Sequence, residues 1–560
     1  MEKMYIISVY KHNVDKMILA LFLLNVVILI FLKIGLFLQL SVFIFILYFI
    51  LIGNLLLGNR NDCLDDFMIL VIVSAFLGIS VFTLLNFVFL HFKDLRLIRL
   101  LNSLFFIIIT ILYFKKGKLL LQIFYKKSLL DKNFILLIFL LSFLITFCTN
   151  YGFKNSSDPR STGRSRHLPS NDKSTIIPDW GDWGWNEDKS MHLIYATYYV
   201  HKEKFPPKVL SHKEVQIFLI SINYLIADAN PRTITAIFKI ISIYFWFSII
   251  YMCCYIGKKV YNLDSFGLLM LTVSVGFLSS VNYPLSDISK SSYTWLLGSA
   301  SMGMYHNVTQ LFSVAVGLSG VICYLHSIKF GNKIFWVGSF LISSSFFFKP
   351  SFFTTVTPLI FILIPFYSQR IDKDKIFGYF ILLLIPIFWQ IYPIIFHIQK
   401  TSLNLTVKPM ALFVRRVEQF NKFPTENKYL LISFCLIFSY MIFLPIFIDL
   451  MIKIRLHTLK YIAQNIFLII RRNIITIYFI LVFISGFLPC FFLVESNVRM
   501  YHGNLAWGRQ AGYLLLIPLL VNSIVTIENK IIKKVAFVIW GLHIWGGILH
   551  LLLFTMKGQL

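Results

Sequence analysis

The sequence predicts an all-helical protein that crosses a membrane many times and carries external loops and amphipathic helices. Of its 560 residues, 58% are apolar and only 14% are charged, whereas soluble domains average about 45–50% apolar and about 25% charged residues. The apolar residues fall into runs of roughly 15 to 25, the length of a helix that crosses a bilayer. These observations exclude a soluble cytoplasmic enzyme and predict about 14–15 spans.

The predicted spans form two groups on either side of a long polar stretch. About five helices are expected in 1–148 and about ten in 233–560. Between them, 149–232 is predicted to be a large external loop with an amphipathic helix near 191–203, and its apolar run at 213–227 is short enough to re-enter the membrane without crossing it. The spans are expected near 17–32, 34–57, 67–91, 97–114, 134–148, 233–256, 265–283, 310–328, 334–348, 352–367, 376–398, 430–452, 474–494, 511–528 and 535–554.

The charge balance indicates how the chain is oriented. There are 52 Lys and Arg residues against 25 Asp and Glu residues, a formal net charge of +27. The basic residues are scattered and no binding motif accompanies them, which argues against a nucleic-acid partner. Because basic residues collect in cytoplasmic loops, the clusters at 115–132 and 453–473 predict a cytoplasmic N-terminus, although Lys93 and Arg96 fall on the outer side. The expected location is a bacterial inner (plasma) membrane.

Cysteine spacing and motif searches exclude several classes of function. The seven cysteines lie mostly inside apolar runs, as at Cys253, Cys254 and Cys323. None has the spacing of a zinc site or a disulfide framework, so no metal ligands are predicted from cysteine. Walker, GxGxxG, GxSxG and HExxH motifs do not occur, which excludes nucleotide hydrolysis, dinucleotide binding and the commonest hydrolase and metalloprotease classes.

The predicted orientation places the loops with unusual chemistry on the external side. An enzyme that works at the outer membrane surface would carry its polar groups there, whereas a pump or pore usually carries ionisable groups within its spans. The external loops are 149–212, 284–309, the Lys349-Pro350-Ser351 turn, 399–429 and 495–510.

The segment 178–192 is the richest in candidate residues, with three tryptophans and four carboxylates. A carboxylate at the water–lipid boundary can act as a general base or hold a divalent cation, and tryptophan can stack on a sugar or anchor the loop. The alternative is that Glu187 and Asp188 only favour the start of a helix, with interfacial tryptophans beside them. The candidates are Glu187 and Asp188 for catalysis, and Trp183, Trp185 and His192 for substrate binding.

The acidic pair is followed by His192-Leu-Ile-Tyr-Ala-Thr-Tyr-Tyr and by Lys204-Phe205-Pro206-Pro207. This segment resembles the first large external loop of the GT-C superfamily of membrane glycosyltransferases, which includes protein mannosyltransferases, aminoarabinose transferases and oligosaccharyltransferases. The resemblance implies that Asp188, or else Glu187, is the catalytic base or a ligand of a divalent cation. In that family the loop usually follows the first span, whereas five predicted spans precede it here. Two explanations stay open: an N-terminal module has been added to this chain, or the similarity arose by chance.

Two other external segments carry single candidate groups. His306 and Asn307 stand at the start of a span, where they can bind a sugar hydroxyl or a phosphate, or simply cap the helix. Lys349 interrupts two apolar runs, so it can pair with a lipid phosphate or extend toward water from a tight turn.

The last external segment, 495–509, is dense in polar residues and glycines. If it is helical, Glu495 and Arg499 lie on one face as an ion pair. If it is a loop, Arg499 and Arg509 are phosphate candidates, and Trp507 is a sugar-stacking or boundary residue. The substrate-binding candidates in this segment are Glu495, Arg499, His502, Asn504 and Trp507.

The function expected from these features is the transfer of a sugar from a polyprenyl-phosphate or polyprenyl-diphosphate donor in cell-envelope polysaccharide or glycolipid synthesis. Asp188 or Glu187 would activate the acceptor hydroxyl, while Lys349, Arg499 and His306 would neutralise the leaving phosphate. The expected partners are the lipid bilayer and the lipid-linked donor, and the sequence leaves the oligomeric state open. The alternatives are a polysaccharide polymerase or ligase, and a non-enzymatic flippase or transporter.

Overall fold

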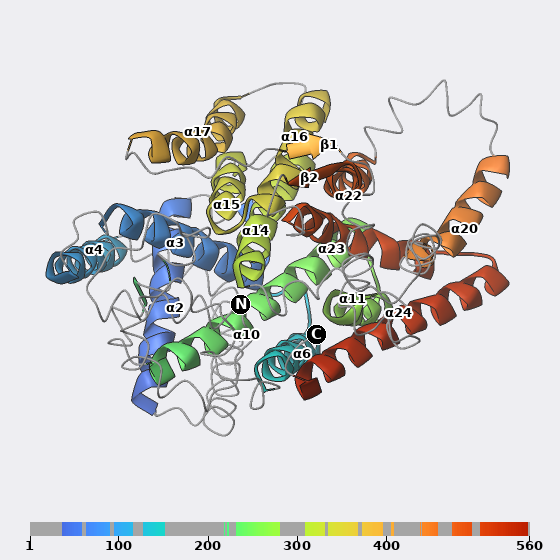
Figure 1. Ribbon diagram of the computed structural model, residues 1–560, viewed down its shortest axis with the longest axis horizontal. Helices are drawn as coiled ribbons and strands as arrows, with labels where there is room; N and C mark the ends of the chain where they lie inside the picture. The colour runs from blue at the N-terminus through green and yellow to red at the C-terminus, as the bar shows by residue number, and fades with distance from the viewer. Residues whose placement is uncertain are drawn as a thin grey trace, which may run out of the picture. The chain divides into compact units, whose positions relative to one another are not determined.

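The computed structural model confirms the all-helical class (Figure 1). In the part of the chain that it describes there are 14 α-helices and two strands of three residues each. The described residues are 36–58, 63–89, 95–115, 127–151, 218, 221–222, 231–279, 308–330, 334–367, 372–395, 405–407, 437, 440–456, 473–495 and 504–557.

The described helices lie at the positions of the predicted spans from 34–57 onward, and the predicted span at 17–32 lies outside the described residues. Three boundaries are wrong. The helix expected at 265–283 ends at Phe277, and the one expected at 430–452 begins at Phe443 after a turn at 441–442. The helix expected to begin at 511 begins at Asn504. The elements are α2 (Leu36–Leu57), α3 (Phe67–Phe89), α4 (Leu95–Lys115), α6 (Lys132–Tyr151), α10 (Pro231–Tyr261), α11 (Ser265–Phe277), α14 (Val308–Phe330), α15 (Phe335–Phe348), α16 (Pro350–Tyr367), α17 (Lys373–Ile395), β1 (Leu405–Val407), α20 (Phe443–Leu456), α22 (Ile474–Phe492), β2 (Leu493–Glu495), α23 (Asn504–Val525) and α24 (Lys530–Lys557).

Six of the described helices are long and apolar enough to cross a membrane, and five shorter helices are also apolar. Large apolar side chains on α17 are about half exposed, including Phe377 at 52%, Phe380 at 57% and Ile387 at 50%. Such a continuous apolar surface is unusual in water and is expected where a helix faces lipid. These helices therefore indicate association with a bilayer, while the number of spans stays a prediction.

The chain folds into two compact units that interleave along the sequence. Unit 1 consists of Met1–Met252, Leu311–Lys349 and Asp372–Gln399, and unit 2 consists of Cys253–Gln310, Pro350–Ile371 and Lys400–Leu560. Unit 1 thus draws helices from both predicted groups of spans, whereas unit 2 draws helices only from the second group.

Unit 1 is held together by aromatic rings that meet in series. The ring of Phe76 on α3 lies 5.0 Å from that of Phe245 on α10, and Phe245 lies 4.4 Å from Phe312 on α14. Phe312 in turn lies 5.3 Å from Phe348 at the end of α15. Such tilted and edge-to-face ring contacts add to the stability gained from burial alone.

A reciprocal amide pair joins α3 to α4. Asn86 Nδ2 donates to Asn102 Oδ1 at 3.1 Å, and Asn102 Nδ2 donates to Asn86 Oδ1 at 2.9 Å. Each amide also donates to a carbonyl of its own helix. Because both side chains are buried, the pair specifies how these two apolar helices align.

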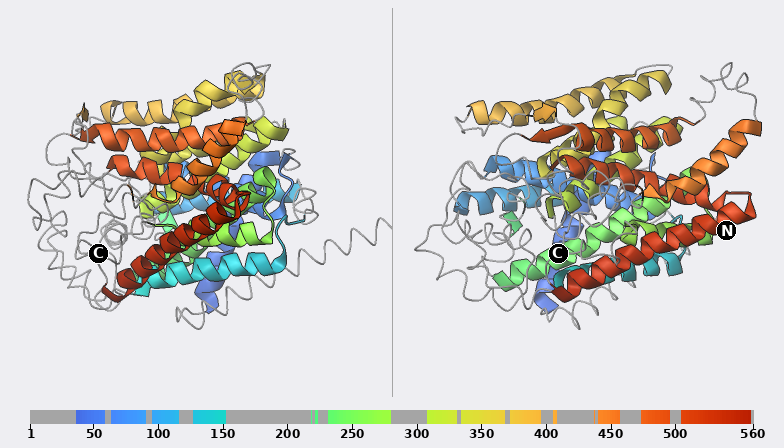
Figure 2. Two further views of the ribbon diagram at one scale, coloured as in Figure 1. Left: turned by 90° about the vertical axis from the view of Figure 1, so that its right-hand side faces the viewer. Right: turned by 45° about the vertical axis from the view of Figure 1, so that its right-hand side comes forward.

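Unit 2 contains two close helix pairs, α22 with α23 and α11 with α24. Helices α22 and α23 run side by side in both views of Figure 2. Trp540 Nε1 on α24 donates to Ser274 Oγ on α11 at 2.8 Å, and His543 Nδ1 bonds to the carbonyl of Ser279. The rings of Phe266 and Phe537 near the starts of α11 and α24 lie 5.8 Å apart, so the two helices run in parallel.

Two hydrogen bonds in unit 1 join segments that lie far apart in the sequence. Phe67 N donates to Lys127 O at 3.2 Å, and Phe335 N donates to Asp374 Oδ2 at 2.9 Å. Both bonds are donated by the first residue of a helix, α3 or α15. Which end faces the cytoplasm stays a prediction.

Helices α2 and α3 approach so closely that glycine is required at their crossing. A Cβ atom at Gly78 would lie 2.0 Å from Phe49 O, and one at Gly53 would lie 1.8 Å from Ser74 O. Both obstacles are backbone atoms, which cannot rotate away as a side chain can. The two glycines therefore allow van der Waals contact between the helix backbones, as small residues do in membrane helix pairs.

We predict that Gly78→Ala lowers the stability of the protein by roughly 2 kcal/mol or more, because α2 and α3 must separate to admit the methyl group. The measurement is thermal unfolding of the purified protein in detergent micelles. Gly541→Ala on α24 is the matched control, since its new Cβ would meet nothing within 4 Å and alanine favours a helix interior by about 1 kcal/mol. Equal losses in the two variants would contradict the close crossing.

Candidate functional site

Three of the five predicted external segments contact one another in unit 2, and the fourth, 284–309, is described only at its last two residues. Strand β1, from 399–429, pairs antiparallel with β2 at the start of 495–510, with Thr406 opposite Val494. Ser351 Oγ, at the start of α16, donates to Gln310 Oε1 at the start of α14, at 2.9 Å. The fifth segment, 149–212, lies outside the described residues.

In unit 2, α23 lies against the start of α16. A Cβ atom at Gly508 would lie 2.6 Å from Thr355 Oγ1 and 3.5 Å from Ser351 O. On its other side, Gly508 lies against Gly486 of α22, where an added Cβ on Gly486 would lie 2.5 Å from Gly508 O. These small residues allow α16, α22 and α23 to pack closely at Gly508, the residue before Arg509.

Arg509 is the central polar residue of this region, and its side chain is only 2% exposed. Its Nη1 donates to Tyr440 Oη at 3.0 Å. Its Nε and Nη2 have no hydrogen-bond partner among the described residues. Because a guanidinium keeps its charge under all ordinary conditions, this is a buried cation with most of its donors unused.

The neighbours of Arg509 on α23 are also buried and polar. Tyr513 lies one turn further along the same face, and its hydroxyl has no partner among the described residues. Gln510, next to Arg509 in the sequence, is 1% exposed. Burial of such groups is costly unless another group completes their hydrogen bonds, so the cluster suits a polar or anionic ligand.

Aromatic rings form the wall around Arg509 and Tyr513. Tyr440 lies 6.3 Å from Tyr513 and 5.3 Å from Phe487, measured between ring centroids. Phe483 lies 5.8 Å from Tyr513, and Phe443 lies 6.1 Å from it. We refer to Arg509, Tyr440 and Tyr513, with these rings, as the Arg509 cluster. An apolar wall lowers the local dielectric and strengthens the attraction of the guanidinium for an anion.

The structure describes only some of the residues that the sequence singled out. Lys349 is buried at the end of α15, where its N–H donates to Ser345 O at 3.0 Å and its carbonyl accepts from Ser313 Oγ at 2.8 Å. It belongs to unit 1. The candidates outside the described residues are Trp183, Trp185, Glu187, Asp188, His192, His306, Asn307, Arg499 and His502.

The predicted loop at 495–510 needs two corrections. Glu495 ends strand β2, so the helical arrangement considered for Glu495 and Arg499 is wrong at Glu495. Asn504 and Trp507 belong to the first turns of α23, not to a loop. The polar composition of this stretch resembled a loop, but the helix tolerates it because Arg509 and Gln510 face the interior of unit 2.

Sequence reasoning missed the partners of Arg509. Tyr440 lies in an apolar run 69 residues earlier, where an aromatic residue is indistinguishable from an ordinary core residue. Tyr513 did carry a signal, since it follows Arg509 by four residues and therefore shares its helical face.

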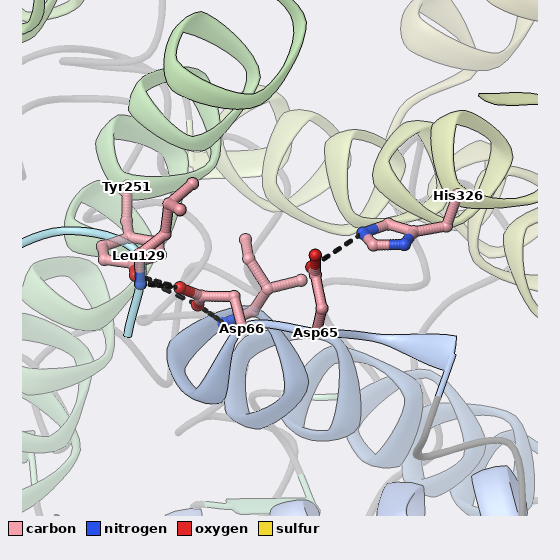
Figure 3. Close-up of polar contacts among 6 residues, drawn as sticks. Asp65, Asp66, Leu129, Tyr251 and His326 are labelled. Atoms are coloured by element: carbon pink, nitrogen blue, oxygen red, sulfur yellow. Dashed lines mark hydrogen bonds and ion pairs between the residues drawn. The ribbon is translucent and has the colours of Figure 1, made fainter. Parts of the chain in front are cut away.

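A second polar cluster, in unit 1, surrounds Asp66 immediately before α3 (Figure 3). Its carboxylate accepts hydrogen bonds from Ile69 N at 2.8 Å, from Leu129 N, and from Tyr251 Oη at 3.0 Å. The Tyr251 hydroxyl also lies 2.7 Å from Ser128 Oγ. Asp66 thus joins the start of α3, the segment before α6 and helix α10.

The adjacent carboxylate makes a weaker contact. Asp65 Oδ1 lies 3.8 Å from Nε2 of His326 on α14, and the two side chains are 49% and 1% exposed. Figure 3 shows the two acids turned to different partners. At this distance and exposure, the Asp65–His326 pair contributes little to stability beside the bonded Asp66.

Burial raises the pKa of Asp66 to about 6, although the hydrogen bonds from Leu129, Ile69 and Tyr251 lower it in part. A carboxyl group whose pKa is higher in the folded chain holds its proton more tightly when folded. Its contribution to stability is therefore complete below the ordinary value of 3.8 and is lost as the pH rises through about 6. At about 1.4 kcal/mol for each tenfold change in proton affinity, the loss is roughly 3 kcal/mol.

We predict that part of the decrease in melting temperature between pH 4 and pH 7 comes from Asp66 and is absent in Asp66→Asn, which has no proton to release. The measurement is thermal unfolding in detergent over this pH range. Asp264→Asn is the control, because Asp264 caps α11 through Gly267 N at 2.8 Å but is exposed. An unchanged pH dependence in Asp66→Asn would show that another group is responsible.

The described residues contain no group of three or more His, Cys, Asp or Glu side chains that could hold a metal ion. The divalent cation that the resemblance implies concerns Glu187 and Asp188, outside the described residues. Comparison with family models, with curated proteins and with solved structures finds no match for this chain.

Proposed function

We propose that this protein is a membrane glycosyltransferase that moves a sugar from a polyprenyl-phosphate or polyprenyl-diphosphate donor to an acceptor at the external membrane face. The observation that carries the proposal is a buried arginine in unit 2, Arg509, beside the contact between the predicted external segments at 349–351 and 495–510. An enzyme acting on a lipid-linked phosphate needs such a cationic site beside its apolar helices. The sequence resemblance at 187–207 supplies the catalytic part of the proposal.

The proposed reaction is a direct displacement. The acceptor hydroxyl oxygen attacks the anomeric carbon of the sugar, and the bond from that carbon to the donor phosphate breaks with its electron pair. Asp188, or else Glu187, takes the proton of the acceptor hydroxyl. Basic groups neutralise the charge that develops on the leaving phosphate, for which Lys349, Arg499 and His306 are the sequence candidates.

A flippase or transporter is the second candidate, and buried histidines favour it. His543 and His550 lie on α24 within a helix long enough to cross the membrane, and both are buried. Transport pathways for protons or cations usually combine such groups with acidic residues inside the spans. None of the six described helices that could cross a membrane carries an Asp or Glu within its span, so the described residues favour the enzyme.

The first test concerns orientation, on which the external chemistry depends. We predict that Ser161→Cys reacts with a membrane-impermeant thiol reagent in intact cells, whereas Lys127→Cys does not react until the membrane is opened. The parent chain controls for labelling of the native cysteines. The reverse pattern would place all the proposed site residues on the cytoplasmic side and overturn the proposal.

The second test concerns the base. We predict that Glu187→Gln/Asp188→Asn lowers sugar transfer by about 10²-fold or more, because the amides keep the size of the acids but accept no proton. The double substitution prevents one acid from replacing the other. Transfer is measured with membranes and a labelled polyprenyl-linked sugar, and the amount of inserted protein is the control. Full transfer by normally inserted protein would refute the catalytic assignment.

A further inference from the structure

We propose that the Nε and Nη2 edge of Arg509 is a binding site for the phosphate of a phosphate ester, with Tyr440 as the residue that positions the guanidinium. The inference deepens the glycosyltransferase proposal and rests on it for the identity of the ligand. It keeps Arg509, already a phosphate candidate from the sequence, and adds Tyr440 and Tyr513 to the candidates for donor binding.

The geometry of the hydrogen bonds selects one edge of the guanidinium. Tyr440 Oη occupies Nη1 at 3.0 Å, while Nε and Nη2 have no partner among the described residues. These two nitrogens point their N–H groups the same way along the side of the planar group. This fork matches two oxygen atoms of one phosphate and gives the strongest form of charge-assisted hydrogen bonding.

The burial of Nε and Nη2 of Arg509 indicates that an anion binds there. Arg509 is 2% exposed, so water cannot replace the missing partners easily. The contrast with Asp66 is direct, since that buried carboxylate accepts hydrogen bonds from two backbone N–H groups and a tyrosine. Burying a permanent positive charge with unused donors costs free energy, and a bound anion would offset that loss.

The groups beside the fork extend the same site. The Tyr513 hydroxyl has no partner among the described residues, and it is close enough to Arg509 and Tyr440 to interact with both electrostatically. It can donate to a further oxygen of a tetrahedral phosphate, which a planar carboxylate does not have. The rings of Phe443 and Phe483 line the cluster with apolar surface, as suits a phosphate attached to a hydrocarbon chain.

The test measures binding without sugar transfer. The full-length protein in detergent micelles is heated with a short-chain polyprenyl phosphate, with the corresponding uncharged polyprenol, with inorganic phosphate or with acetate. We expect polyprenyl phosphate to raise the melting temperature and the uncharged polyprenol to leave it unchanged, because a ligand stabilises the folded state that binds it. An equal response to inorganic phosphate keeps the site and assigns it to a soluble phosphate ester.

Three variants test whether binding needs the two-pronged hydrogen bonding of the Arg509 guanidinium or only its positive charge. Arg509→Lys keeps the charge but loses the fork, so we expect it to need about tenfold more polyprenyl phosphate for the same shift. Tyr440→Phe frees the guanidinium to rotate and should weaken binding by a smaller factor. Arg99→Lys on α4, where the arginine is exposed, is the matched control and should bind as the parent does.

Arg509→Met distinguishes a ligand site from a structural ion pair. Replacing a buried cation that lacks a partner by an apolar side chain should raise the melting temperature of the ligand-free protein and abolish the shift with polyprenyl phosphate. A fall in the ligand-free melting temperature would show that a group of the chain itself already pairs with Arg509, and would overturn the inference. So would an unchanged phosphate response in Arg509→Met.

The phosphate site and the transferase can each be refuted without refuting the other. The Glu187→Gln/Asp188→Asn protein should still bind polyprenyl phosphate, because its substitutions leave Arg509 intact. Phosphate binding that depends on Arg509 in a parent protein without any sugar transfer would refute the transferase and keep the site. Full transfer by Arg509→Met would refute the site and keep the transferase.

Discussion

A polar group buried in this apolar chain must find its partner inside the protein, and this requirement governs both units. In unit 1 it is met at Asp66, which accepts from two backbone N–H groups and from Tyr251, and at Asn86 and Asn102, which bond to each other. In unit 2 it is met only in part, because the described residues supply Arg509 with one acceptor, Tyr440. The difference separates polar groups that hold the fold from polar groups available for a ligand.

Close helix packing is what brings these polar groups together. Glycines at 53 and 78 let α2 and α3 touch through their backbones, and glycines at 486, 508 and 512 do the same for α22 and α23. Lipid gives little hydrophobic drive for one helix to pack on another, so such small-residue contacts carry much of the association. In unit 2 they also place the start of α23 against α16 and thereby set the surroundings of Arg509.

The placement of the described carboxylates supports the proposed external chemistry more than the alternative of transport. A path through a membrane needs ionisable groups along the spans, whereas the described carboxylates lie outside the six helices that could cross a membrane. Asp66, Asp131 and Asp264 stand instead at helix starts, where their side chains accept from backbone N–H groups. The Arg509 cluster lies near the start of α23, where a headgroup phosphate could reach it without crossing the bilayer.

The sequence by itself determined the helical class and the approximate place of each described helix. Apolar content and run length are local properties of a segment, and they decide whether it can cross the hydrocarbon core as a helix. It also singled out the segments predicted to be external, three of which contact one another in unit 2. Only the tertiary structure decided that Arg509 lies in a helix with Tyr440 as its partner, and that Asp66 meets Tyr251, 185 residues away. Such pairings depend on which helices pack together, and neither composition nor periodicity along one segment contains that information.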